Sequence, residues 1–147
     1  MSRFYSLVAA AAFSFLIVTS GCTPATSEPK PTAPMAPKMS LKESLEKASK
    51  LAAQLNQGFA DGAGHDVVHD PLHQIGDLLS ALPKQISSSE ISDENKTALA
   101  TAVDVLMNSY GKIDAKFHGG EGAEYADVKD EIEEALNSLD SVVGTMN

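Results

Sequence analysis

The side chains with the clearest potential for chemistry are four histidines, which fall in two segments of the chain. His65, His69 and His73 follow one another at intervals of four within GHDVVHDPLHQIG at 64–76, and His118 lies in a later FHGG segment. Imidazole nitrogen is a ligand for zinc, copper, iron and nickel, and a carboxylate can complete such a coordination shell. The histidines therefore raise the hypothesis of a transition-metal site.

Whether the first three histidines share a helix face depends on where their helix begins. Asp70 is a good N-cap and Pro71 suits the first helical position, so we expect the helix to start there. His65 and His69 would then precede the helix, and only His73 would lie on it. The spacing also lacks the fixed logic of a zinc-binding H-E-x-x-H helix.

Each histidine also has an ordinary structural interpretation. His118 can cap a helix C-terminus, where the helix dipole favours a cation. His69 can be a pre-cap residue beside Asp70, His73 can lie at the solvent edge of its helix, and His65 can be part of a loop. A third use is docking that responds to protonation. The sequence leaves these alternatives open beside the metal site.

Four segments carry apolar residues at helical spacing, and no segment shows the alternation of a strand. These segments are 41–59, 72–82, 99–117 and 125–142. Ser40 and Ser92 are expected N-caps, Pro83 is expected to end or kink the second helix, and glycines follow the first and third helices. The sequence predicts an all-α domain over 40–147, an antiparallel up-down four-helix bundle.

In such a bundle, the start of the second helix, the end of the third and the start of the fourth meet at one end. This topology would gather the histidines with nearby carboxylates. The candidate metal ligands are His65, His69, His73, His118 and Glu121. Asp114, one turn before His118, and Asp70 are candidate supporting residues. Zinc or copper suits this donor set. The other possibility is that the protein carries no cofactor.

Composition excludes several classes of function. The chain has 147 residues and a formal net charge of -9, so its surface repels nucleic acid phosphates. It has no tryptophan and only three tyrosines, too few for base-stacking platforms. Its single cysteine cannot form an internal disulfide, a multi-thiolate zinc site or a C-x-x-C-H haem attachment. We therefore expect no nucleic acid partner.

Motifs of known enzyme classes are also missing from the sequence. No glycine-rich phosphate loop follows a strand, and no nucleophile elbow surrounds a serine. No glutamate has a histidine three residues later, the pattern of di-iron bundles. We therefore expect that the protein is not an enzyme.

The first 21 residues, MSRFYSLVAAAAFSFLIVTSG, have the layout of an export signal. Arg3 provides the positive start, and 4–18 is an apolar run of fifteen residues, short for a transmembrane helix but typical of a signal-peptide core. The following Ser20-Gly21-Cys22 resembles the lipobox of bacterial lipoproteins, in which the cysteine is acylated and becomes the new N-terminus. Thr19 departs from the aliphatic residue that this family prefers.

This resemblance implies a signal peptide over 1–21 and a membrane anchor, such as palmitate, on Cys22. Each buried lipid methylene contributes about 0.8 kcal/mol, so several acyl chains on one residue make attachment nearly permanent. Thr23, where some lipoproteins carry an inner-membrane retention Asp, favours the outer membrane facing the periplasm by analogy. The segment 22–39 holds five of the seven prolines and is expected to be an extended, lipid-anchored linker.

The helical part resembles small uncharacterised bacterial envelope proteins. The shared features are HDPLHQIGDLL at 69–79, FHGG at 117–120 and Tyr125, five residues after the second glycine. The resemblance implies a helical bundle and the recurrence of the histidine-bearing segments, and it implies no known activity.

Two functions are compatible with these features. The first is a binding or interaction module of the cell envelope, a tethered acidic bundle that docks an envelope protein. The second is a transition-metal-binding lipoprotein with a histidine and carboxylate site at one end of the bundle.

The lipobox yields a direct prediction. In a bacterial host, the native membrane-bound product should begin at Cys22 and carry acyl chains on that residue, as measured by intact-protein mass spectrometry. The Cys22→Ser variant should lose the acyl mass, because the thiol that accepts the lipid is gone. A native product with an unmodified Cys22 still joined to residues 1–21 would contradict the anchor.

Overall fold

A computed structural model describes residues 39–146 of the chain. The expected signal peptide over 1–21, the lipidation residue Cys22 and all but the last residue of the linker at 22–39 lie outside the described residues. Within residues 39–146, none of the helices combines the length and the apolar character needed to cross a membrane.

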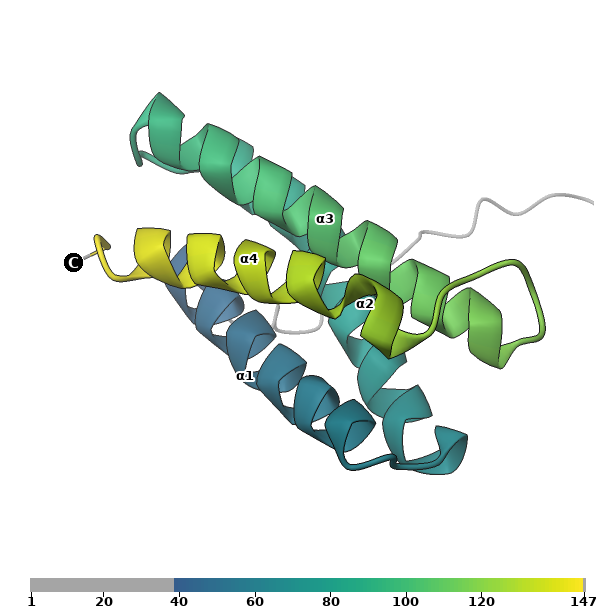
Figure 1. The fold of residues 1–147 in the computed structure, drawn as a ribbon. Helices are drawn as coiled ribbons and strands as arrows, with labels where there is room; N and C mark the ends of the chain where they lie inside the picture. Colours follow the sequence, from purple (N-terminus) through teal and green to yellow (C-terminus); the bar gives the residue numbers. More distant parts are fainter. Residues whose placement is uncertain (1–38, 147) are drawn as a thin grey trace, which may run out of the picture. The chain divides into compact units, whose positions relative to one another are not determined.

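The described part of the chain is all-helical. Its elements are α1 (Leu41–Ala60), α2 (His65–Ser88), α3 (Asp93–Phe117) and α4 (Tyr125–Val143), and no strand occurs between residues 39 and 146. Each helix packs against two others: α1 against α2 and α4, and α3 against α2 and α4 (Figure 1). The expectation of an all-α four-helix bundle is confirmed for this part of the chain.

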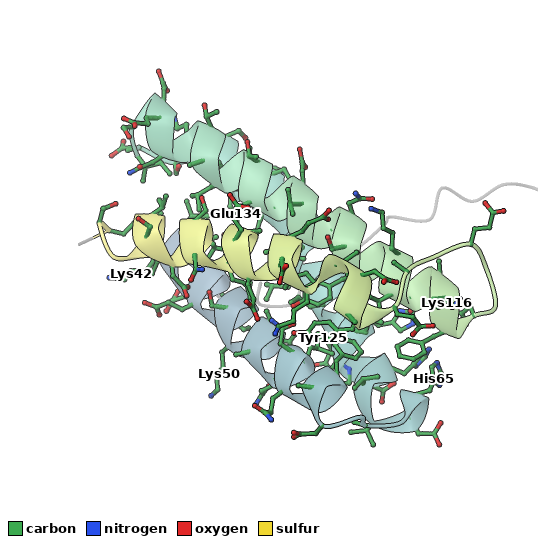
Figure 2. The ribbon with its side chains drawn as sticks, in the orientation of Figure 1. Lys42, Lys50, His65, Lys116, Tyr125 and Glu134 are labelled. Atoms are coloured by element: carbon green, nitrogen blue, oxygen red, sulfur yellow. The ribbon has the colours of Figure 1, made fainter. Side chains whose placement is uncertain are left out.

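One end of the bundle collects the termini that the sequence analysis singled out. The end of α1, the start of α2, the end of α3 and the start of α4 lie together there (Figure 1). His65, Lys116 and Tyr125 mark this end, whereas Lys42 lies at the other end, where its ammonium donates to the carbonyl of Met146 at 2.6 Å (Figure 2).

Within residues 39–146, the buried core is a single cluster of aliphatic side chains from all four helices together with Tyr110, and the partly buried Phe59 and Tyr125 pack against it. Buried side chains recur at intervals of three and four along each helix, as the apolar stripes predict. The largest fully buried hydrophobic residues are Leu45, Leu55, Ile75, Leu79, Leu82, Leu99, Val103, Leu106, Ile132 and Leu139.

The predicted start of the second helix is wrong. α2 begins at His65 with Gly64 as its N-cap, so Asp70 is not the cap and Pro71 lies inside the helix. The physical reason is the apolar stripe, which starts one turn before the proline: Val68 is as well buried as Leu72. Burying such a side chain stabilises by about 1.5–3 kcal/mol, enough to offset much of the roughly 3 kcal/mol that an interior proline costs.

The second helix also continues past Pro83 to Ser88. Of the two expectations for this proline, that it ends or kinks the helix, the first is therefore wrong. The stripe again explains the difference, since Ile86 is buried one turn after Leu82. Near the start of α2, the absence of a side chain at Gly58 of α1 leaves room for Val68. A Cβ atom on Gly58 would stand 3.2 Å from Cγ1 of Val68, closer than ordinary van der Waals contact.

The expected N-caps are confirmed. The Ser40 hydroxyl accepts from the Glu43 backbone N–H at 3.3 Å, and the Glu43 carboxylate accepts from the Ser40 backbone N–H at 2.8 Å. This reciprocal capping box lowers the pKa of Glu43, because the hydrogen bonds favour the charged carboxylate. The Ser92 hydroxyl accepts from the Asn95 backbone N–H at 3.2 Å.

The start of α2 before Pro71 leads to a stability prediction. Pro71→Ala restores the backbone donor that proline lacks, to the carbonyl of Val67 one turn earlier. We expect stabilisation by about 1–2 kcal/mol, the proline penalty reduced by the entropy that proline removes from the unfolded chain. Chemical denaturation measures it, with Gln74→Ala, an exposed position on α2, as the matched control. A helix that started at Pro71 would instead be unchanged or weakened by this substitution.

Candidate metal centre

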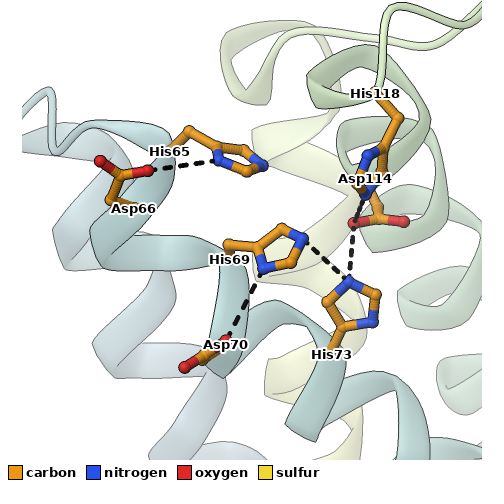
Figure 3. A network of polar contacts seen from close by, with 7 residues as sticks. All are labelled: His65, Asp66, His69, Asp70, His73, Asp114 and His118. Carbon is orange, nitrogen blue, oxygen red and sulfur yellow. Dashed lines mark hydrogen bonds and ion pairs between the residues drawn. The ribbon is translucent and has the colours of Figure 1, made fainter.

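The early start of α2 places three histidines on consecutive turns of one helix. His65, His69 and His73 are four residues apart, so their side chains lie on the same face, one above the other. His118 is the C-cap residue of the neighbouring α3, and Asp114 lies one turn before it. Figure 3 shows the imidazole rings and the Asp114 carboxylate turned toward one another across the two helices.

Three imidazoles and one carboxylate bring their donor atoms together. One donor atom each from His69, His73, His118 and Asp114 lies within 4.8 Å of the other three. The Nε2 atoms of His69 and His73 are 3.2 Å apart (Figure 3). Asp114 Oδ1 is 3.7 Å from Nε2 of His73 and 3.6 Å from Nε2 of His118.

These separations match the edges of a small coordination polyhedron. Metal–ligand bonds of about 2.0–2.2 Å in a tetrahedral zinc site place neighbouring ligand atoms roughly 3.3–3.6 Å apart. The measured separations of 3.2, 3.6 and 3.7 Å are close to this spacing. The four groups, called the His69–His118 site below, can thus surround one metal ion.

The Asp114 oxygen at the centre of the group lacks a hydrogen bond. Oδ1 is buried and has no hydrogen-bond partner among the residues that the structure describes, because both imidazole nitrogens stand beyond hydrogen-bond distance. Nε2 of His65 is the only other buried side-chain polar atom in this condition within residues 39–146. Buried polar atoms without partners are uncommon in folded proteins and call for an explanation, such as a bound ion.

The bundle core holds the site in place. On α2, His69 stands in the sequence between the buried residues Val68 and Leu72. On α3, Asp114 directly follows the buried Ile113. Below the site, the Tyr110 hydroxyl donates to Oδ1 of Asn56 at 3.0 Å, and burial raises the pKa of this phenol. The ligands therefore project from rigid, packed turns, while their tips reach the surface.

The site is open to solvent. The side chains of His73 and His118 are 55% and 53% exposed, and those of His69 and Asp114 are 30% and 32% exposed. A cavity of about 170 Å³ beside His73 and Asp114 is also lined by Gly76 and Gly111. An ion can therefore approach the site from solution over the His73 and His118 rings, while Oδ1 of Asp114 is buried behind them.

Two other candidate residues, Asp70 and Glu121, lie outside the group of four donors. Asp70 is exposed, and its Oδ1 lies 3.7 Å from Nδ1 of His69, the nitrogen that faces away from the site. Such a contact favours the proton on Nδ1 and leaves Nε2 free to bind a metal. Glu121 is exposed and lies outside the donor group. Its loop is held against α3, where Ala123 N–H donates to the Lys112 carbonyl at 3.1 Å.

The acidic residues at the start of α4 make contacts outside the His69–His118 site. Glu124 and Asp127 form a capping box, and Glu124 also contacts the Lys116 ammonium at 3.7 Å. Asp114, which the sequence suggested only as a supporting residue, is instead the carboxylate within reach of two histidines. Its position one turn before His118 was the available signal.

No known family model, curated protein or solved structure matches this chain.

Proposed function

We propose that this chain is a lipid-anchored protein of the bacterial cell envelope that reversibly binds a transition-metal ion. The observation that carries the proposal is the convergence of His69, His73, His118 and Asp114, whose donor atoms lie within 4.8 Å of one another. The residues come from two helices, so the convergence is a property of the bundle and not of a local motif.

The donor types select the class of ion. Three imidazole nitrogens and one carboxylate oxygen suit zinc or copper(II), whereas soft copper(I) prefers the thiolate and thioether ligands absent from this group. The carboxylate also reduces the net charge of the bound cation. The exposed carboxylates of Asp66 and Asp70 nearby add favourable long-range attraction for a cation.

The number of ligands favours binding over catalysis. Four protein ligands fill the shell of a tetrahedral ion, whereas catalytic zinc sites keep one position open for water. The exposure of His73 and His118 supports an ion that exchanges with the surroundings over one permanently enclosed. Capture, storage or delivery of the ion is the role that this arrangement fits.

The cellular location rests on the leader and the lipobox. An ion-binding domain tethered through Cys22 would meet metal ions that arrive in the envelope. Docking of an envelope protein stays a prediction, and it is compatible with metal binding because delivery of an ion requires a recipient.

The first test of the proposed function is metal titration. Calorimetry of the full-length chain in detergent with zinc should give one ion per chain with a dissociation constant of about 1 µM or tighter. Asp114→Asn or His118→Ala should weaken binding by about 100-fold or more, beyond the 10- to 100-fold typical of residues that merely orient a ligand.

Asp104→Asn is the matched control for Asp114→Asn. Asp104 is an exposed carboxylate on the same helix, about 15 Å along its axis at 1.5 Å per residue. The Asp104→Asn variant should leave the affinity for zinc unchanged. Absence of saturable binding by the native chain, or equal affinities for the two Asn variants, would refute the metal site.

Zinc should also stabilise the fold, because the site joins α2 to α3. An ion that binds only the folded state contributes about 2.7 kcal/mol at a free concentration of 100 times its dissociation constant. For a domain of this size we expect Tm to rise by about 10 °C. Calorimetric melting with and without zinc measures this, and Asp114→Asn should lose most of the shift. An equal shift in that variant would indicate zinc binding elsewhere.

A further inference from the structure

A groove runs between α3 and α4, whereas the His69–His118 site lies between α3 and α2. Its volume is about 550 Å³, within the roughly 300–1,000 Å³ typical of ligand clefts. On α3 the groove extends from Ala98 to Asn108, which is about 15 Å along the axis at 1.5 Å per residue. This length is enough to receive nearly three turns of a further helix.

Short side chains leave the groove open. Figure 1 shows α3 and α4 moving apart toward the start of α3 and the end of α4. The buried Ala102 and Ala135 form the floor of the groove, and Ala98 and Ser138 lie on its walls. None of these side chains is long enough to fill the space between the diverging helices. The groove therefore presents apolar surface that the bundle does not cover by itself.

Two carboxylates of α4 border this apolar surface. Glu131 and Glu134 are exposed and line the groove, and Figure 2 shows Glu134 on the side of α4 that faces α3. The Ser109 hydroxyl donates to Oε2 of Glu131 at 3.4 Å. In the described part of the chain no ion pair involves Glu131 or Glu134, whereas the neighbouring Glu133 lies 3.6 Å from the Lys129 ammonium. The groove thus combines an apolar floor with negative charge that no cation of these residues balances.

We propose that this α3–α4 groove is the docking site for a cationic amphipathic helix of a partner protein. The apolar face of the helix lies on the alanines, and its lysines or arginines face Glu131 and Glu134. Amphipathic helices commonly bind grooves in this way, with apolar residues as anchors. Opposite charges at the rim speed the encounter and fix the orientation of the helix. The inference goes beyond the proposed metal binding and does not depend on it.

Charge argues against two other occupants of the groove. A second copy of the chain, related by two-fold symmetry, would bring Glu131 and Glu134 close to the same two carboxylates of its partner. Such like-charge contacts are destabilising at an interface. An anionic membrane surface would be repelled by the same carboxylates. A helix that carries positive charge is the occupant that both the floor and the rim favour.

The test uses two synthetic peptides and the metal-free full-length chain in an uncharged sugar detergent. The first peptide is a fluorescent helix of about 14 residues, or about 20 Å, built from lysine and from leucines spaced by three and four. The second carries glutamate in place of every lysine. Fluorescence anisotropy, corrected for empty micelles, should show the lysine peptide binding at least about tenfold more tightly than the glutamate peptide.

Two pairs of variants locate the binding. Glu134→Lys reverses a charge at the groove, and Glu133→Lys makes the same change at an exposed position of α4 that does not line it. Thr101→Trp fills the groove with an indole, and Ala100→Trp places an indole at an exposed position of α3 outside it.

The two groove variants should bind the lysine peptide more weakly than the native chain does. We expect a loss of about fivefold for Glu134→Lys and about tenfold for Thr101→Trp, while Glu133→Lys and Ala100→Trp stay within about twofold of the native affinity. Circular dichroism verifies that each variant keeps its helical content.

Several outcomes would overturn the docking site. Equal weakening in Glu134→Lys and Glu133→Lys would show attraction to net charge alone, and unchanged binding in Thr101→Trp would show that the groove is not used. Equal affinities for the two peptides would contradict a cationic partner. A dimer of the native chain that Thr101→Trp abolishes, as measured by sedimentation, would assign the groove to a second copy. Because the chain is metal-free throughout, failure of zinc binding would leave this result unaffected.

Discussion

The packing of Val68 in the core is the contact on which the histidine site depends. Val68 is buried beside Gly58 of α1, and this forces α2 to begin before Pro71 rather than at it. The added turns carry His65 and His69. In a loop, each of these residues would lose about 1–2 kcal/mol of backbone entropy on binding an ion, whereas the helix has already fixed them during folding. A single buried valine therefore fixes where these two imidazoles lie.

The site also couples two helices that are otherwise joined by aliphatic packing. His69 and His73 belong to α2, Asp114 belongs to α3, and His118 is the C-cap residue of α3. Asp114 Oδ1 is buried without a hydrogen bond within the described part of the chain, and such a group costs about 1–3 kcal/mol. An ion between the helices would satisfy this oxygen and join the end of α3 to the start of α2. Metal binding as proposed would therefore also stabilise this end of the bundle.

Charge divides the histidine cluster into two parts. Asp114 is the carboxylate that lies among the imidazole nitrogens, while Asp66 and Asp70 stand outside, each beside the outward nitrogen of a histidine. The exposed carboxylates attract cations over a distance but hold none, and Asp114 acts at contact.

Local signals in the sequence determined much of this protein. The apolar stripes defined four helices, Ser40 and Ser92 marked two of their starts, and up-down topology placed the histidine-bearing segments at one end. These features depend on neighbours three or four residues away, which a sequence displays directly. Only the tertiary structure decided where α2 starts, because the burial of Val68 against another helix outweighs the local preference of Pro71.

The roles of the carboxylates were likewise decided in three dimensions. The sequence analysis named Glu121 as a metal ligand and Asp114 only as a supporting residue. Asp114 lies on the side of α3 that faces α2, whereas Glu121 is in a loop that folds back along α3, where Gly122 leaves no room for a Cβ atom against the backbone at Lys112. The register of one helix against another depends on the fit of many side chains at once. No spacing within a single segment encodes it, and for that reason the ligand set emerged only with the packed bundle.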